Sequence, residues 1–341
     1  MSDTIGIDIG SYAIKVAVAQ SKGAGIELTK LASDYNPIGM VLSNDKTTGQ
    51  KLAETLKKLA SEQKLSGQRV FLSLPESLAY TAVVSMPFLS DAELASSINW
   101  EAEQHIPVPL TDINLEYSVL YKPPKSNTGE KMRVLLVGAR KEVVTQLVDL
   151  FSQVGMEVIG LETGLLSLQR ALSSSLSQND AVMVCHLGAL STDVLVTFQG
   201  ELMLAYTTRV GGLALTRGLE RGLELQPRQA EEYKRAYGLD AQQLDGRVRQ
   251  VLLPVVNVLV SELRKAIQFY QATHTANPIR LIMLTGGSAY LPGLPTFLAE
   301  TFGTEVVVAN PMDGKLIGSR AKEPVDMAAY AVAVGLAAQK G

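Results

Sequence analysis

The chain has 341 residues, of which 46% are hydrophobic and 19% are charged, so its apolar content can fill a core in each of about two domains. Its 31 Lys and Arg residues against 34 Asp and Glu residues give a net charge of −3, which excludes an overall basic field for nucleic acid. The single cysteine, Cys185, excludes a disulfide framework and a cysteine-based zinc site.

Nothing in the sequence predicts a membrane-spanning segment. No stretch approaches the roughly 20 apolar residues that a spanning helix needs, and the apolar run Met327–Ala338 is too short. The N-terminal residues Met1–Thr4 carry no basic region, so they do not predict a signal peptide. We therefore expect a cytoplasmic protein that is peripheral at a membrane only through a partner.

The first 80 residues predict a sheet with one helix. Runs of β-branched residues are separated by glycine turns, and leucines recur at helical spacing beyond residue 48. The predicted elements are strands at Thr4–Ile9, Ile14–Gln20, Ile26–Ser33 and Arg69–Leu74 and a helix at Thr48–Gln63.

Residues 81–160 predict a compact β-α-β-β-α-β module, which we interpret as an inserted subdomain. Asp91 is placed to begin its first helix, Pro107 stops that helix, and Gly155 follows the second helix as a terminating residue. The predicted elements are strands at Ala82–Met86, Leu115–Tyr121, Arg133–Ala139 and Glu157–Leu161 and helices at Asp91–His105 and Lys141–Val154.

The second half opens like the first, with two strands around a turn of small residues. Its predicted elements are strands at Ala181–Leu187, Thr192–Thr197, Glu201–Thr208 and Arg280–Leu284 and helices at Ala214–Gly222, Pro227–Gly238, Leu253–Thr273 and after Gly293. Two halves that open alike indicate a duplication, and the alternation of strands and helices predicts an α/β protein with mixed sheets.

Glycine-rich turns follow three of the predicted strands, at Gly10–Ala13, Gly188–Ser191 and Gly286–Ser288. A polyphosphate needs many backbone N–H donors aimed at one point, and glycine lets the backbone approach closely. Asp8, just before the first turn, can hold Mg²⁺ through its waters. One such turn is more often an ordinary hairpin, but three in this order favour a phosphate-binding site.

These turns resemble the phosphate-1, phosphate-2 and adenosine motifs of the actin/Hsp70/sugar-kinase ATPase superfamily. The resemblance implies an α/β, actin-like (ribonuclease H-like) two-lobe fold with mixed five-stranded sheets and an inserted 1C-type subdomain. The segments that carry it are Gly6–Ser11, Leu187–Ala189, Leu284–Gly287, the Ala-Glu-x-x-Lys helix at Ala230–Lys234, and the connecting segments Ser261–Arg264 and Ala328–Ala337.

Within this superfamily the chain is similar to the FtsA/PilM branch, and Trp100–Leu110 resembles a segment of the PilM family of type IV pilus assembly proteins. The resemblance implies a chain that passes through its subdomains in a fixed order. The expected boundaries are 1–80 for subdomain 1A, 81–160 for the inserted subdomain, 161–180 for 1A again, 181–213 for 2A, 214–276 for the helical subdomain 2B, 277–320 for 2A again and 321–341 for the return to 1A.

The resemblance also implies ATP and Mg²⁺ as ligands, with Asp8 holding the metal through water. Lys234 and Glu231 would flank adenosine, and Glu262 would contact ribose. The implied nucleotide-binding residues are Asp8, Gly10, Ser11, Tyr12, Lys15, Gly188, Ala189, Ser191, Gly211, Gly212, Glu231, Lys234, Glu262, Gly286, Gly287 and Ser288.

His186 stands where the phosphate-2 motif normally begins with Asp. That Asp organises the metal and the attacking water in the enzymes of the family, and an imidazole brings no permanent negative charge. We therefore expect ATP binding with weak or absent hydrolysis and assign no catalytic residue. Two roles for His186 stay open: a cationic contact to a phosphate, or a histidine at a strand end that is satisfied by a backbone carbonyl.

The apolar segment after the first helix of the inserted module predicts a partner site. Two prolines fix an extended chain there, which is either a rigid loop packed on its own subdomain or one wall of a groove toward subdomain 1A. The resemblance implies that such a groove takes the N-terminal cytoplasmic peptide of a PilN-like membrane protein. The candidate groove residues are Trp100, Ile106, Pro107, Val108 and Pro109.

The expected function is an ATP-binding scaffold of the type IV pilus inner-membrane platform, with the PilN/PilO pair as partners. The pilus motor ATPases and a second copy of the chain stay open as further partners. Two alternatives also stay open: an FtsA-like polymerising protein and a genuine ATPase of the superfamily. The chain stops soon after the last connecting segment, without the amphipathic membrane helix usual in FtsA-like chains. His105 and His274 have no neighbours at metal-ligand spacing.

Overall fold

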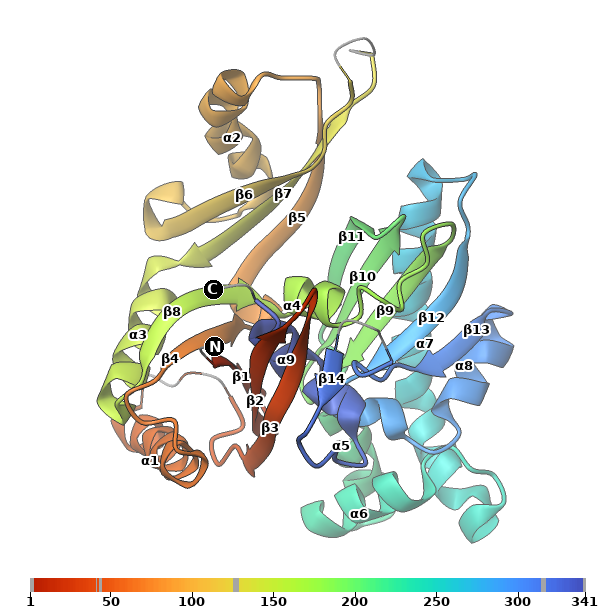
Figure 1. Cartoon of the computed structure of the whole chain (residues 1–341). Helices are drawn as coiled ribbons and strands as arrows, with labels where there is room; N and C mark the ends of the chain where they lie inside the picture. The colour runs from red at the N-terminus through yellow and green to blue at the C-terminus, as the bar shows by residue number, and fades with distance from the viewer. Residues whose placement is uncertain (1–2, 41, 43–44, 125–128, 314–316, 340–341) are drawn as a thin grey trace.

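The computed structural model describes residues 3–40, 42, 45–124, 129–313 and 317–339, which form two lobes with a smaller subdomain on the first (Figure 1). Met1 and Ser2 of the N-terminal stretch considered above lie outside the described residues. None of the helices within these ranges is long and apolar enough to cross a membrane.

The first lobe is built on a six-stranded sheet of order β14-β3-β2-β1-β4-β8. The pairs β1–β2 and β2–β3 are antiparallel, and β4, β8 and β14 pair in parallel with β1, β4 and β3. The strands are β1 (Thr4–Ile9), β2 (Ala13–Lys22), β3 (Gly25–Tyr35), β4 (Arg69–Leu74), β8 (Glu157–Thr163) and β14 (Ile317–Ser319).

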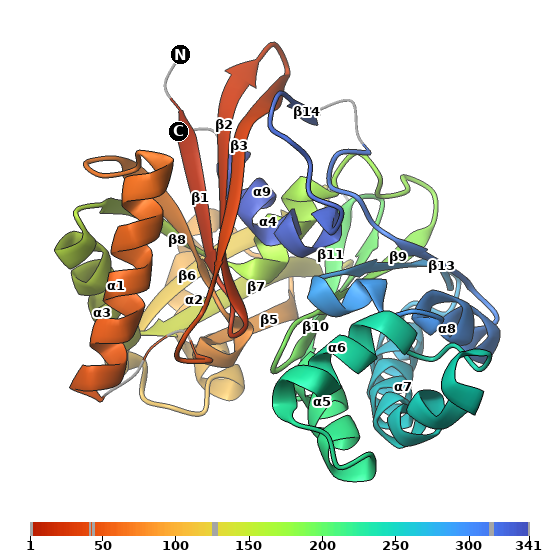
Figure 2. The ribbon, with the colours of Figure 1, turned by 90° about the horizontal axis from the view of Figure 1, so that it is seen from below.

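Two pairs of helices cover the two faces of this sheet (Figure 2). On one face, α1 (Lys46–Gln63) and α3 (Lys141–Val154) bury leucines and Phe151 against the isoleucines of β1. On the other face lie α4 (Gly164–Ala171) and α9 (Ala331–Ala337). These two helices can cross closely because Gly335 has no side chain. A Cβ added there would clash with the carbonyl oxygen of Ser167.

The inserted subdomain is smaller than the sequence predicts. It consists of an antiparallel sheet of order β5-β7-β6 and the helix α2 (Asp91–His105), with β5 at Ala79–Met86, β6 at Ile113–Tyr121 and β7 at Met132–Arg140. The last helix and strand of the predicted module, α3 and β8, belong to the first lobe, where α3 packs beside α1 and β8 pairs with β4. The predicted β-α-β-β-α-β module is therefore wrong in its second half, because local periodicity does not reveal which sheet a strand joins.

The second lobe repeats the topology of the first in a five-stranded sheet of order β11-β10-β9-β12-β13. β9, β10 and β11 are antiparallel neighbours, and β12 and β13 continue the sheet in parallel. The elements are β9 (Ala181–Leu187), β10 (Thr192–Phe198), β11 (Glu201–Thr208), β12 (Ile279–Thr285), β13 (Glu305–Val308), α5 (Gly212–Gly222), α6 (Pro227–Tyr237), α7 (Arg247–Thr273) and α8 (Leu294–Phe302).

The common order of five strands supports the predicted duplication, and the short edge strand β14 makes the first sheet one strand longer than predicted. Two long segments differ in extent from the sequence prediction. The helix predicted from Leu253 begins at Arg247, so Pro254 lies inside α7 rather than in its first turn. The apolar run from Met327 forms a short 3₁₀ helix (Met327–Tyr330) followed by α9.

Candidate functional site

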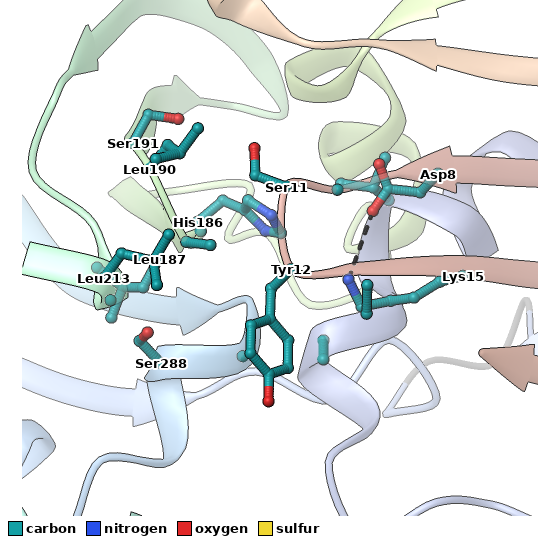
Figure 3. Close-up of a pocket in the computed structure, with 18 of the residues that line it drawn as sticks. Asp8, Ser11, Tyr12, Lys15, His186, Leu187, Leu190, Ser191, Leu213 and Ser288 are labelled. Carbon is teal, nitrogen blue, oxygen red and sulfur yellow. Dashed lines mark ion pairs between the residues drawn. The ribbon is translucent and has the colours of Figure 1, made fainter. Parts of the chain in front are cut away.

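The three glycine turns line one cavity of about 990 Å³ between the two lobes. The first turn joins β1 to β2, the second joins β9 to β10, and the third follows β12. Figure 3 shows their side chains facing the same space, with Ser11 and Tyr12 from the first lobe opposite His186 and Ser288 from the second. The turns meet because the two related sheets present the same strand ends to the gap between them.

The first turn is held rigid from both sides. The N–H of Gly10 donates to the carbonyl oxygen of Ala13 at 3.1 Å, and the side-chain amide of Asn36 donates to the carbonyl oxygen of Gly10 at 2.9 Å. Below the turn, the buried carboxylate of Asp8 accepts a hydrogen bond from the Ser73 hydroxyl at 2.7 Å and lies 3.7 Å from Lys15 Nζ. The first-lobe turn therefore brings its own ion pair to the cavity.

The second turn is tied to the N-terminus of α5. The N–H of Gly212 donates to Gly188 O, and the N–H of Leu213 donates to Ala189 O, both at 2.9 Å. Gly188 N also donates to Ser191 O at 2.9 Å, which closes the turn. Backbone hydrogen bonds thereby fix both segments beside the cavity.

The third turn depends on the backbone freedom of glycine. Gly286 has a φ of +85°, and a Cβ added there would lie 2.5 Å from Leu187 O. Gly287 has open space around its Cα, and it lines the cavity together with Ser288. Gly286 thus packs behind the cavity, while its two successors face it.

A buried polar cluster closes the cavity on the side of α6. Lys234 Nζ donates to Glu231 at 2.6 Å, to Thr216 Oγ1 at 3.0 Å and to Gly212 O at 3.3 Å. Burial lowers the pKa of Lys234 although Glu231 opposes this effect, and the pKa of Glu231 is lowered by Lys234 against the effect of burial. Arg235 also binds Glu231, at 2.9 Å.

His186 is neutral at pH 7. Burial lowers its pKa to about 4, although the charge of Asp8 opposes the shift. Its Nδ1 lies 3.0 Å from Thr285 Oγ1 on the neighbouring strand. Of the two roles left open by the sequence, the cationic phosphate contact is therefore not supported, and the partner of the imidazole is a hydroxyl rather than a backbone carbonyl.

Two carboxyl groups that the sequence analysis did not single out also line the cavity. Burial raises the pKa of Glu76 to about 7, and it raises the pKa of Asp193 to about 6, with the charge of Asp8 adding to the second shift. Glu76 accepts from Thr81 Oγ1 at 2.7 Å, and Asp193 accepts from Thr207 Oγ1 at 2.9 Å. The sequence could have pointed to Asp193, because it follows the second glycine turn by two residues. No comparable pattern points to Glu76, which only follows a strand.

The structure brings most of the predicted nucleotide-binding residues together. Glu262 lies elsewhere on α7, where it binds Tyr206 and Lys265, and Gly211 and Gly286 pack behind the cavity wall. The predicted residues that line the cavity are Asp8, Gly10, Ser11, Tyr12, Lys15, Gly188, Ala189, Ser191, Gly212, Glu231, Lys234, Gly287 and Ser288.

The five predicted groove residues do not form one surface. Ile106 is only 3% exposed, in the core of the inserted subdomain, whereas Trp100 is 67% exposed on α2. Pro107 and Pro109 are exposed and Val108 is half-buried. Ile106 lines a cavity of about 230 Å³ that the other four do not line. This cavity lies between β5 of the inserted subdomain and β11 of the second lobe.

Comparison with known proteins agrees with this architecture. The structure of a PilM-PilN type IV pilus biogenesis complex superposes with a TM-score of 0.83 at 24% identity, over 98% of this chain and 97% of that one. The ethanolamine utilization protein EutJ from Carboxydothermus hydrogenoformans superposes with a TM-score of 0.58 at 14% identity, over 99% and 89% of the two chains. MreB5 of Spiroplasma citri bound to ADP gives 0.56 at 12% identity, over 98% and 95%.

These structures share the two-lobed actin-like fold with the chain. The family model described as type IV pilus assembly protein PilM matches residues 6–340, which is nearly the whole sequence. The chain therefore belongs to the PilM family of type IV pilus assembly proteins.

Proposed function

We propose that the protein is an ATP-binding scaffold of the type IV pilus inner-membrane platform. The observation that carries the proposal is the meeting of three glycine turns from two related lobes around one cavity of about 990 Å³. Backbone N–H groups and the hydroxyls of Ser11 and Ser191 would hold phosphates there, and the third turn with Ser288, together with the Lys234–Glu231 cluster, would border the nucleoside. MreB5, which shares the fold, is bound to ADP in its structure.

The chemistry of the donor set fits Mg²⁺ as a hydrated ion. Both carboxylate oxygens of Asp8 are engaged, by Ser73 and by Lys15, so its free lone pairs suit waters of the ion rather than direct coordination. Within the described residues, no three His, Cys, Asp or Glu side chains are grouped to bind a metal directly. When bound with the nucleotide, the ion would supply positive charge between the phosphates.

We propose that hydrolysis is slow or absent. The neutral imidazole of His186 supplies no negative charge to the hydration shell of a metal and cannot organise an attacking water as a carboxylate does. The test is steady phosphate release from ATP by the purified chain. Release should stay near background in the wild type and rise in His186→Asp, whereas fast release by the wild type would contradict the scaffold proposal.

One observation favours a second candidate, a genuine ATPase. Glu76 and Asp193 place carboxyl groups with raised pKa values at the cavity, and a carboxyl near neutral pKa suits a general base. If wild-type release is fast, Glu76→Gln and Asp193→Asn identify the base by their loss of rate. The same two variants leave a non-hydrolysing scaffold at background, so the experiment separates the candidates.

We further propose that the chain is held at the inner membrane by the N-terminal cytoplasmic peptide of a PilN-like protein. The PilM-PilN complex shares the fold of this chain at 24% identity. The 230 Å³ cavity between β5 and β11 is the proposed peptide site, because both strands lie at the edge of their sheets. An extended peptide could add backbone hydrogen bonds to such edges.

The peptide site is tested by filling the cavity from two of its half-buried lining positions. Ala82 on β5 and Ala205 on β11 are half-buried and line it, so Ala82→Arg and Ala205→Arg should abolish capture of a synthetic PilN-type peptide. Ser118→Arg, on the exposed edge strand β6, is the matched control and should bind normally. Nucleotide affinity should remain in all three. Unchanged capture in both cavity variants would place the peptide elsewhere.

A further inference from the structure

The positive side chains that line the large cavity fall into two groups. Lys15 is paired with Asp8, and Lys234 and Arg235 are both paired with Glu231. The other two cations of the lining, Arg209 and Arg217, make no ion pair and no hydrogen bond with any residue that the structure describes. Two arginines with unpaired guanidinium groups therefore line a cavity whose other Lys and Arg side chains are already paired.

The backbone of Arg209 is fixed beside the phosphate-2 turn. Its predecessor Thr208 pairs with Thr192 in the β10–β11 ladder, and the Thr192 hydroxyl donates to the carbonyl oxygen of Val210 at 2.7 Å. Arg209 is therefore held between two anchored neighbours, alongside Ser191, which precedes Thr192. Arg217 lies one turn after the cavity-lining Leu213 on α5.

The carboxyl on the same strand pair does not compete for this guanidinium. Asp193 accepts from Thr207, its register partner on β11, and not from Arg209. The phosphate-2 turn itself carries no acidic side chain, and His186 beside it is neutral. The charge of Arg209 is consequently available to a ligand.

The position of the turn indicates which ligand group would meet it. Figure 3 places Ser191 and Ser288 on opposite sides of His186 and Leu187. Ser288 belongs to the turn proposed to border the nucleoside, so the phosphate chain would run from there toward Ser191. A guanidinium presents planar, permanently charged donors that match two phosphate oxygens at once.

We propose that Arg209 is a specificity residue whose guanidinium binds the terminal phosphate of a nucleoside triphosphate, with Arg217 adding a weaker attraction at the same end. The inference rests on the proposed nucleotide binding and adds to it a discrimination between triphosphate and diphosphate.

The experiment is calorimetric titration of the full chain with ATP, ADP and adenosine. Arg209→Gln should weaken the affinity for ATP by about 10- to 100-fold, which is the usual contribution of a charge-assisted hydrogen bond. The affinities for ADP and adenosine should change far less. Arg209→Lys should be intermediate because an ammonium lacks the planar fork. Arg217→Gln should weaken ATP by less than Arg209→Gln. The matched control is Arg221→Gln, an exposed arginine further along α5 that does not line the cavity.

The outcomes separate the two proposals. If the wild type binds neither ATP nor ADP, the proposed function fails and this inference fails with it. If the wild type binds both but Arg209→Gln loses them equally or loses neither, the inference alone is overturned. Thermal unfolding of the ligand-free variants should match the wild type because both arginines are exposed, which excludes a folding defect as the cause.

Discussion

The two lobes share one strand order but place different charges at the cavity between them. In the first lobe, Asp8 and Lys15 form an ion pair beneath the turn after β1. In the second, the corresponding strand β9 carries a neutral His186 one residue before its end, and the nearby Asp193 has a pKa raised to about 6 by burial. The two lobes therefore repeat the strand order around the cavity but differ in the side chains at corresponding strand ends, an ion pair in the first lobe and an imidazole in the second.

The largest expected effect tests whether the conformation of the third glycine turn, which follows β12, requires a glycine at position 286. Gly286→Ala forces a Cβ to within 2.5 Å of Leu187 O at a φ of +85°. We expect it to lower the free energy of unfolding by about 2–4 kcal/mol, measured by urea denaturation. Gly287→Ala is the neighbouring control and should change stability by less than about 0.5 kcal/mol, because its Cα has open space around it. Equal effects would refute this account of the turn.

The next effect compares corresponding positions of the two lobes. Asp8→Asn leaves the half-buried amine of Lys15 without its counter-charge and should destabilise the protein by about 1–3 kcal/mol. His186→Gln keeps a polar partner for Thr285 and removes no charge, so it should cost less than about 1 kcal/mol. Chemical denaturation of both variants at pH 7 measures the difference. A larger cost at position 186 would mean that the second lobe depends on its imidazole.

A pH-dependent effect follows from Glu76, whose pKa rises from 4.5 to about 7 on folding because the carboxyl is buried. Its protonated form favours the folded state, so this stability is present below pH 4.5 and is lost as the pH rises to 7. Asp193 acts in the same direction between pH 3.8 and 6. Glu76→Gln removes the larger contribution.

We therefore expect the stability of Glu76→Gln relative to the wild type to increase by about 1–2 kcal/mol from pH 5 to pH 8. Urea unfolding of both proteins at the two pH values measures this difference. His186 acts in the opposite direction, since its pKa falls from 6.5 to about 4 on folding and its contribution is lost as the pH falls. That residue is present in both proteins and cancels in the comparison. If the free energies of unfolding of the two proteins changed equally with pH, burial would not raise the pKa of Glu76.

The smallest expected effect concerns the contact that joins the lobes across the cavity. The guanidinium of Arg235 lies 5.3 Å from the ring centroid of Tyr12, in the first-lobe turn. Tyr12→Ala should cost about 0.5–1 kcal/mol, and Tyr12→Phe should retain most of this because the ring face remains. A double-mutant cycle with Arg235→Ala isolates the pair. A coupling energy near zero would mean that the two side chains do not hold the lobes together.

The inserted subdomain shows why some sequence predictions failed. The helix of Trp100 and the loop of Ile106 are continuous in sequence, yet one side chain is exposed and the other is buried against Gly138. A helix that ends in an extended segment turns neighbouring side chains to different sides. The resemblance of Ser261–Arg264 to a connecting segment predicts that Glu262 contacts ribose, but in the structure this side chain accepts a hydrogen bond from Tyr206.

The sequence by itself determined the strands, most helices and the three glycine turns, because periodicity and turn chemistry are local properties. It also determined the departure at His186 and predicted the PilM family, which is confirmed. Only the tertiary structure decided that α3 and β8 join the first lobe, that His186 bonds to Thr285, and that Glu76, Asp193 and Arg209 line the cavity. These facts depend on which distant segments pack together, and burial and pairing across the gap between lobes are set by the whole fold.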